Sequence, residues 1–344
     1  MAEASGPARR GPPNESETAV RILVTGGAGY IGSVVVTRLL EEGHQVVVLD
    51  DLSTGHRDAV PEEAEFVHGR VHDAADILGP AGLDILSGFD GAVHLAAASL
   101  VAESMSNPAK YEENNVVGSS RLVSALVDAG VPRLVFSSTA AVYGGPDEVP
   151  IREDAVCRPV SPYGESKLAV DRVLASTAAE KGLAAVSLRY FNVAGAYAGR
   201  GERHSTETHL VPIALEVALG RRPELVVYGD DYPTPDGTCV RDYIHVADIA
   251  DAHLLALAKC EKGRHEIYNL GNGNGSSVRD VLVTVEQVTG AKLPVRVAGR
   301  RAGDPAVLVA SAQRAAEQLR WRPARPLLEQ MVGDAWEVLT SREA

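Results

Sequence analysis

The first half of the chain alternates short runs of apolar, largely β-branched residues with longer stretches in which apolar residues recur every three or four positions. The short runs are typical of buried strands and fall at residues 21–24, 45–49, 64–68, 92–95, 133–138 and 184–190. The longer stretches, such as residues 31–42 and 161–181, predict helices. Strands that alternate with helices predict an α/β fold built on a doubly wound parallel sheet.

The second half has a different pattern, because glycine, proline and polar residues become denser after residue 192. Helices are predicted at residues 208–219 and 277–289, and strands at residues 225–228 and 293–297. We expect a smaller C-terminal α/β lobe, residues 191–344, that binds substrate over the C-terminal edge of the sheet formed by residues 20–190. Residues 241–260 are expected to return to the first lobe.

Composition narrows the classes of function. The chain of 344 residues has a net charge of −13 and a pI of about 5.3, which argues against a nucleic-acid surface. No stretch approaches the ~20 apolar residues of a membrane span. The three cysteines show no metal-ligand spacing, and so sparse a set fits a reducing cytoplasm. Residues 1–19 are rich in proline, glycine, serine and charge and lack the apolar segment of a secretory signal, so we expect a disordered tail there.

A glycine-rich loop joins the first predicted strand to the first predicted helix. In Gly26-x-x-Gly29-x-x-Gly32, the first glycine allows a tight turn, the second lets the backbone approach a phosphate, and the third lets the helix pack on the strand. The N–H groups at the helix N-terminus would then face a pyrophosphate. Asp50 ends the next strand, about 20 residues further on, where a ribose-binding acid is expected. Because Asp50 and Asp51 would repel a 2′-phosphate, these residues predict a Rossmann-like domain that binds NAD and not NADP. The competing interpretation is an ordinary strand–turn–helix.

Tyr163 and Lys167 lie four residues apart near the start of the predicted helix 161–181, which places a phenol and an ammonium on one face. A neighbouring cation favours the phenolate, so Tyr163 can act as a general base near neutral pH, and Lys167 can reach the cofactor's ribose hydroxyls. Thr139 comes directly after the strand 133–138, at the sheet edge where ligands bind, and could donate a hydrogen bond to a substrate oxygen. The alternatives are a solvated helix face for the pair and a helix cap for Thr139.

A series of motifs between residues 20 and 335 carries a family resemblance. The motifs are TGGAGYIGS (25–33), LDDLSTGHRDAVP (49–61), HLAAASLVAESM (94–105), NNV (114–116), FSSTAAVYG (136–144), SPYGESK (161–167), LRYFNVAGA (188–196), DYPTPDGTCVRDYIHVAD (231–248), YNLGNG (268–273) and RRAGDPA (300–306). The chain resembles the extended short-chain dehydrogenase/reductase family, and most closely its UDP-glucose 4-epimerase branch. The resemblance implies inversion at C4 of a UDP-hexose, interconverting UDP-galactose and UDP-glucose through a 4-keto intermediate, with bound NAD as a transient hydride carrier.

The resemblance also implies roles for individual residues. The implied catalytic residues are Tyr163, Lys167 and Thr139. The implied cofactor-binding residues are Gly26, Gly29, Tyr30, Ile31, Gly32, Asp50, Leu95, Asn114, Tyr163, Lys167 and Tyr190. The implied substrate-binding residues are Thr139, Tyr163, Asn192, His209, Leu210, Tyr228, Arg241, Arg301, Asp304 and Leu308. No metal ligand is implied.

Neighbouring branches of the family differ at the two positions after Thr139. Sugar-nucleotide 4,6-dehydratases carry an Asp-Glu pair there for water elimination and related decarboxylases carry a glutamate, whereas this chain has Ala140 and Ala141. Two alternatives stay open: a 4-epimerase of another nucleotide sugar (a UDP-N-acetylhexosamine, pentose or uronate) and a non-catalytic NAD-binding protein. Leu308 stands where some epimerases have a tyrosine walling the sugar pocket, and Arg70 stands where an aspartate near the adenine is usual.

Two predicted helical segments, residues 116–129 and 168–179, have apolar faces that suit a contribution to a homodimer. The alternative is burial of both faces within one protomer. The expected partners are therefore a UDP-sugar and a second copy of the chain, with neither nucleic acid nor membrane.

Overall fold

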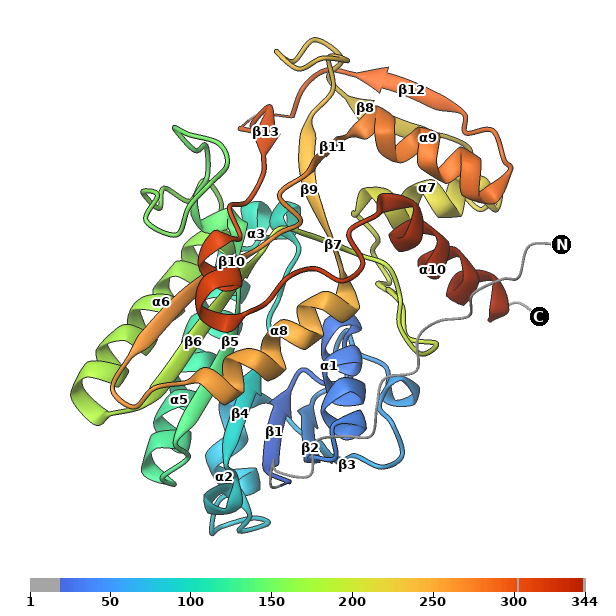
Figure 1. The fold of residues 1–344 in the computed structure, drawn as a ribbon. Coiled ribbons are helices and arrows are strands. Elements are labelled where there is room, and N and C mark those ends of the chain that lie inside the picture. Colours follow the sequence, from blue (N-terminus) through green and yellow to red (C-terminus); the bar gives the residue numbers. More distant parts are fainter. Residues whose placement is uncertain (1–18, 302, 343–344) are drawn as a thin grey trace, which may run out of the picture.

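The computed structural model describes residues 19–301 and 303–342, which form two lobes (Figure 1). Apart from Ala19, the tail predicted over residues 1–19 lies outside the described residues. Within the described part of the chain, no helix is both long enough and apolar enough to cross a membrane.

A seven-stranded parallel sheet forms the first lobe, with the strand order β10-β6-β5-β4-β1-β2-β3. Its strands are β1 (Arg21–Thr25), β2 (Gln45–Asp50), β3 (Glu65–His68), β4 (Gly91–His94), β5 (Arg133–Thr139), β6 (Ala184–Tyr190) and β10 (His265–Leu270). The chain steps outward from β1 to β3 on one side and from β4 to β6 on the other. The carboxyl ends of β1 and β4 therefore mark the switch point at which ligands bind in such sheets. The sequence pattern predicts the first six strands but not β10.

Helices cover both faces of this sheet, which confirms the doubly wound α/β fold (Figure 1). On one face, α1 (Tyr30–Glu41) packs against α8 (Val246–Lys259). On the other, α2 (Ala74–Leu78), α5 (Gly118–Asp128) and α6 (Pro162–Lys181) share a second core. Successive side chains of β1 point to opposite faces of the sheet, so the strand contributes to both cores: Ile22 and Val24 belong to the first and Leu23 to the second.

The helix that carries the predicted acid–base pair has clear local start and stop signals. The Ser161 hydroxyl caps α6 by accepting the Gly164 N–H at 3.2 Å, and Pro162 occupies the first turn, where a missing N–H costs nothing. Gly182 ends the helix in the left-handed conformation, with φ of 78°. Before α5, the helices α3 (Val101–Ser106) and α4 (Pro108–Tyr111) lead into a π-helical stretch, Glu112–Val117, a feature that is frequent at functional sites.

The second lobe is built around β9 (Val240–His245). This strand pairs in parallel with β7 (Asn192–Ala194) and β13 (Val307–Leu308) and antiparallel with β11 (Gly275–Ser277). A separate two-stranded sheet joins β8 (Leu225–Tyr228) to β12 (Val295–Ala298). The apolar core of the second lobe is enclosed by three helices, α7 (Leu210–Ala218), α9 (Val278–Thr289) and α10 (Leu328–Ser341). The predicted elements at 208–219, 225–228, 277–289 and 293–297 correspond to α7, β8, α9 and β12.

Candidate active site

The loop after β1 has the contacts that a phosphate-binding loop requires. Gly26 has a φ of +75°, and a Cβ there would lie 2.5 Å from the backbone nitrogen of Ala96, so only glycine fits. A Cβ on Gly32 would lie 2.0 Å from the Gly26 oxygen, so that glycine lets α1 pack on the loop. Gly29 is the N-cap of α1 and offers no side-chain acceptor to the first-turn N–H groups, and its bare Cα leaves them accessible. These N–H groups fit a pyrophosphate.

Asp50 ends β2 beside this loop, where the sequence predicts a ribose-binding acid. Its Oδ2 accepts the Ala28 N–H at 2.9 Å, and its Oδ1 accepts the Leu52 N–H at 2.8 Å. Burial raises the pKa of the Asp50 carboxyl, and these two backbone bonds act in the opposite direction. Each carboxylate oxygen keeps further acceptor capacity for a ribose hydroxyl.

Thr139, Tyr163 and Lys167 meet at the carboxyl end of β5. The Thr139 hydroxyl caps the following turn by accepting the Ala141 N–H at 3.2 Å, and it lies close enough to the Tyr163 phenol to lower the pKa of that phenol. The Lys167 side chain is buried, and its Nζ donates to the backbone oxygen of Ser137 at 2.9 Å. This ammonium lies 5.9 Å from the centre of the Tyr163 ring. The structure therefore brings Thr139, at the end of β5, to the Tyr163–Lys167 pair of α6.

The electrostatics of these three residues differ from the sequence prediction of a readily formed phenolate. Burial raises the pKa of Tyr163, and the neighbouring Thr139 hydroxyl offsets only part of this rise. Burial lowers the pKa of Lys167 to about 8, with Asp171 acting in the opposite direction. Because the lysine ammonium is bonded to the Ser137 carbonyl and not to the phenol, its charge alone does not produce the phenolate.

Close packing fixes the position of Tyr163. A Cβ on Gly164 would lie 2.6 Å from the Ala141 oxygen, so the first turn of α6 rests directly on the turn after β5. The buried ring of Tyr111 meets the Tyr163 ring edge-on, with 6.3 Å between centroids. The Tyr111 hydroxyl is itself anchored to the Leu100 oxygen at 2.6 Å. Sequence reasoning missed Tyr111, because no motif marks it and its contact crosses between helices.

Asn115 is a second residue that sequence reasoning missed. Its amide accepts the Ala98 N–H at 2.8 Å, donates to the Ala98 oxygen at 3.0 Å and donates to the Ser166 hydroxyl at 3.0 Å. It thereby ties the loop after β4 to the helix that carries Tyr163. Its neighbour Asn114, implied by the family resemblance, has its Oδ1 3.5 Å from a guanidinium nitrogen of Arg70. The doubled asparagine of the NNV motif was the sequence signal that could have identified Asn115.

Other residues implied in cofactor binding surround the same loop. Tyr30 and Ile31 begin α1, and the Tyr30 hydroxyl donates to the Gly195 oxygen at 2.6 Å. Leu95 comes directly after β4, and its N–H donates to the Thr25 oxygen at 2.9 Å. The Leu95 bond holds the ends of β1 and β4 together at the switch point, and the Tyr30 bond joins the start of α1 to the residue after β7.

Tyr190 ends β6 and pairs in register with Thr139 on β5. Its hydroxyl lies 2.8 Å from Nε2 of His253 in α8. Tyr190 therefore lies at the predicted sheet edge, while its polar group is engaged within the core under α8.

Residues implied in substrate binding gather on the second lobe. The Arg241 guanidinium on β9 pairs with the Asp304 carboxylate. Leu308 on β13 lies opposite Arg241 in the parallel register and packs against the apolar cluster behind the turn after β5. The Arg301 guanidinium stacks on the exposed ring of Tyr228, 3.9 Å from its centroid.

Asn192 and Arg300 lie close to these substrate-lobe residues. Asn192 begins β7, which lies beside β9 with Asn192 opposite Tyr243. Arg300 pairs with Asp231 at 2.7 Å, so the two adjacent arginines, Arg300 and Arg301, have different partners.

His209 and Leu210 stand at the start of α7. Leu210 packs against the core of the second lobe. His209 is the N-cap residue, and its Nδ1 lies 2.8 Å from carboxylate oxygens of both Glu202 and Glu207. Burial alone would lower the pKa of His209, but these two carboxylates overcome that effect and raise it to about 10. The sequence predicts a substrate contact for His209 and gives no hint of this acidic partnership.

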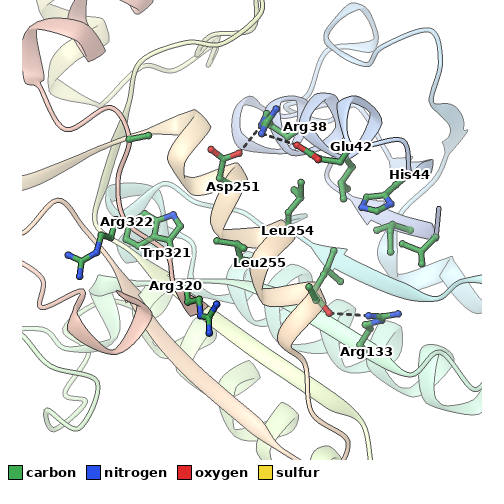
Figure 2. A pocket seen from close by; sticks show the side chains of 16 residues that line it. Arg38, Glu42, His44, Arg133, Asp251, Leu254, Leu255, Arg320, Trp321 and Arg322 are labelled. Atoms are coloured by element: carbon green, nitrogen blue, oxygen red, sulfur yellow. Dashed lines mark hydrogen bonds and ion pairs between the residues drawn. The ribbon is translucent and has the colours of Figure 1, made fainter. Parts of the chain in front are cut away.

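A separate cavity of about 650 Å³ lies between α1, α8 and residues 320–324 (Figure 2). Arg38 and Asp251 face each other at one side of it, joined by an ion pair of 2.8 Å, and Trp321 lines another side. Its lining contains none of the three residues Thr139, Tyr163 and Lys167. We therefore place the candidate active site at the switch point of the sheet and not in this cavity.

Comparisons with known proteins identify relatives over almost the whole chain. The model of the NAD dependent epimerase/dehydratase family matches residues 22–271. A UDP-glucose 4-epimerase of Streptomyces lividans is 56% identical over 317 residues, which cover 92% of this chain and 95% of the relative. A UDP-glucose 4-epimerase of Corynebacterium glutamicum is 51% identical over 319 residues, with the same coverage of 92% and 95%. The crystal structure of UDP-glucose 4-epimerase from Brucella ovis in complex with NAD superposes with a TM-score of 0.88 at 41% identity, covering 93% of this chain and 98% of that one.

Proposed function

This chain belongs to the NAD-dependent epimerase/dehydratase family, and we propose that it interconverts UDP-galactose and UDP-glucose as a UDP-glucose 4-epimerase. The observation that carries the proposal is the meeting of Thr139, Tyr163 and Lys167 at the carboxyl end of β5, on the same edge of the sheet as the glycine loop after β1. Ala140 and Ala141 stand where an elimination would need its acid–base pair. Relatives that cover 92% of the chain have the same activity in their names.

The cofactor is NAD, and the glycine loop fits its pyrophosphate. Gly29 leaves the first turn of α1 accessible, while Asp50 offers carboxylate oxygens to a ribose. Lys167, whose ammonium lies 5.9 Å from the centre of the Tyr163 ring, is the proposed partner of the ribose hydroxyls. When bound, NAD supplies a positively charged acceptor for the C4 hydride and later returns that hydride, so the net reaction consumes none.

Tyr163 moves the proton in this reaction. Its phenolate accepts the proton of the 4-hydroxyl as C4 is oxidised, and the phenol returns it to the 4-keto oxygen after the sugar has turned over. Thr139 orients the phenol oxygen, a role supported by the lowering effect of its hydroxyl on the pKa of Tyr163. Because burial raises the pKa of Tyr163 and Lys167 is bonded elsewhere, the phenolate depends on a positive charge beyond that of the lysine.

The second lobe binds the nucleotide and the sugar. Arginine suits a diphosphate through charge-assisted, bidentate bonds, which favours Arg241 for this role, and Asp304 beside it suits ribose hydroxyls. The remaining proposed substrate contacts are Asn192, His209, Leu210, Tyr228, Arg301 and Leu308.

A second substrate class, the UDP-N-acetylhexosamines, is favoured by one residue. Leu308 lies opposite Arg241 and against the turn after β5, at the place expected for the sugar wall. A leucine lacks the ring and hydroxyl of a tyrosine, so the wall is shorter and less polar. We therefore expect some activity on N-acetylated substrates.

We also propose a cytoplasmic homodimer. The apolar side chains of the two predicted dimer helices, such as Leu122, Leu126 and Leu174, are buried within the protomer. A dimer would therefore use other apolar side chains, such as Val101 and Met105 of α3, which are exposed. A cytoplasmic location is supported by the absence of disulfides among the described cysteines, all three of which are free.

The test is to incubate the purified protein with UDP-galactose, and separately with its N-acetyl analogue, without added NAD. We expect conversion of UDP-galactose to UDP-glucose with NAD retained from purification, and a weaker conversion of the analogue. NADH that accumulates one for one with product would show a dehydrogenase. Absence of any conversion by protein shown to carry NAD would show a non-catalytic binding protein.

A further inference from the structure

Four potential metal ligands gather in the segment between β7 and α7. They are Glu202, His204, Glu207 and His209, which we call the 202–209 cluster. One ligand atom from each residue lies within 4.8 Å of every other. We propose that the 202–209 cluster binds one divalent transition-metal ion, of which Zn²⁺ is the best match, and that this ion fastens the start of α7 to the first lobe.

The distances from each imidazole nitrogen to the two carboxylates are near those of a tetrahedral site. His209 Nδ1 lies 2.8 Å from an oxygen of each glutamate, and His204 Nδ1 lies 2.9 Å from Glu202 and 3.8 Å from Glu207. Metal–ligand bonds of about 2.1 Å in a tetrahedron separate the ligand atoms by roughly 3.4 Å. Shifts of a few tenths of an ångström in side-chain position would open these contacts into that geometry.

The burial of the two carboxylates distinguishes the 202–209 cluster from a solvated acidic surface. The side chains of Glu202 and Glu207 are only 8% and 5% exposed, and both carboxylates have imidazoles as ion-pair partners. Buried carboxylates are costly unless they are paired or coordinate a metal. A divalent ion would neutralise both charges while the two imidazoles serve as neutral ligands.

The mixture of ligand types selects the kind of metal. Mg²⁺ and Ca²⁺ take sets made of oxygen, whereas two imidazoles with two carboxylates suit Zn²⁺ and its first-row neighbours. Four protein ligands leave no open position, which is the arrangement of a structural zinc site and not of a catalytic one. The proposal therefore adds no step to the epimerase reaction.

The position of the cluster indicates what the ion would do. His209 is the N-cap of α7, which lies in the second lobe. Within the same segment Arg203 pairs with Asp58 of the first lobe at 2.8 Å, and the Arg203 oxygen lies 3.0 Å from His56 Nε2. Tyr30 in the glycine loop lies within electrostatic range of Glu202 and Glu207. An ion here would hold α7 over the cofactor loop.

The experiment is a zinc titration of the protein in its NAD-bound form. The purification tag must be removed, since oligohistidine binds zinc, and the protein is dialysed first against a chelator and then against chelator-free buffer. Zinc is added in competition with a chromophoric chelator to wild type, His204→Ala and Glu207→Gln. His68→Ala is the matched control, because His68 is an exposed histidine of the first lobe outside the cluster.

We expect one zinc per chain in wild type and in His68→Ala. His204→Ala and Glu207→Gln should each lose at least about 100-fold in affinity, more than a lost outer partner typically costs. Cobalt in place of zinc should give the intense visible absorption of a tetrahedral site in wild type and His68→Ala only. NAD content and circular dichroism of each variant establish that it is folded.

Two results would overturn the proposal. One is wild-type protein that takes up much less than one zinc per chain at micromolar free zinc. The other is zinc binding that persists undiminished in both folded cluster variants. Glu207→Gln keeps the size of the side chain, so a variant close to the native shape is available even if His204→Ala does not fold.

Discussion

Lys167→Met is expected to stabilise the protein while it removes catalysis. The lysine is 2% exposed, and burial lowers its pKa from the usual 10.5 to about 8. This change corresponds to roughly 3 kcal/mol spent on keeping the ammonium charged at neutral pH. The hydrogen bond from Lys167 to the Ser137 oxygen offsets about 0.5–1.5 kcal/mol of this cost. Methionine has a similar unbranched shape without the charge, so we expect a net gain of about 2 kcal/mol at pH 7.

The pH dependence has a definite sign. Because the pKa of Lys167 is lower in the folded protein than in the unfolded chain, the unfolded chain binds more protons between pH 8 and 10.5. The stability of wild type should therefore gain a contribution that grows with pH across this window, and the penalty is fully present below pH 8. Lys167→Met lacks this contribution, so its advantage over wild type should vanish near pH 10.5.

The assay is urea unfolding of nucleotide-free wild type and Lys167→Met, monitored by circular dichroism near pH 7 and near pH 10. Lys181→Met is the matched control, since Lys181 is the exposed lysine at the end of the same helix. A parallel measurement of kcat should show a loss of at least about 10²-fold in Lys167→Met. If Lys167→Met is less stable than wild type at pH 7 and has the same pH dependence, the charge is not a burden on the fold and the reasoning is wrong.

Three further predictions concern the reaction itself. Tyr163→Phe should lower kcat by about 10²–10⁴-fold at unchanged NAD content, and a value near wild type would remove Tyr163 from proton transfer. Arg241→Ala should weaken UDP-sugar binding far more than NAD binding, as measured by calorimetry with each ligand, because its guanidinium faces Asp304 on the substrate lobe; equal loss of both would indicate a folding defect. Leu308→Tyr should lower kcat/KM for UDP-N-acetylhexosamines relative to UDP-hexoses, and an unchanged ratio would mean that Leu308 is not the sugar wall.

The fold was predictable where local pattern and global position agree. Six strands of the sheet are marked by apolar runs with helices between them, because strands buried on both faces need such runs. The seventh, His265–Leu270, mixes charged, polar and apolar residues and joins the sheet only because α8 carries the chain back to β6. That return is a long-range property of the chain, and no local spacing encodes it.

The site was predictable where a motif fixes both residue and neighbour. The spacing of Tyr163 and Lys167, and the glycines of the loop, depend on local geometry alone. The bond of Lys167 to the Ser137 oxygen and the bridge from Asn115 to Ala98 join distant segments. Such contacts depend on how helices pack on the sheet. The sequence therefore predicted residues of the site but not the hydrogen-bond partner of each one.

The path of the chain between the lobes limits how this protein can be recombined. Residues 246–270 supply α8 and β10, which complete the first lobe after the chain has already built much of the second. A fragment that stops at residue 190 would lack an edge strand and would leave the apolar side of α1 uncovered. A chimera that exchanges substrate specificity between relatives must therefore keep residues 19–190, 246–270 and 312–321 from one parent, because all three segments contribute to the core under α1 and α8. A single crossover point would divide the hydrophobic core.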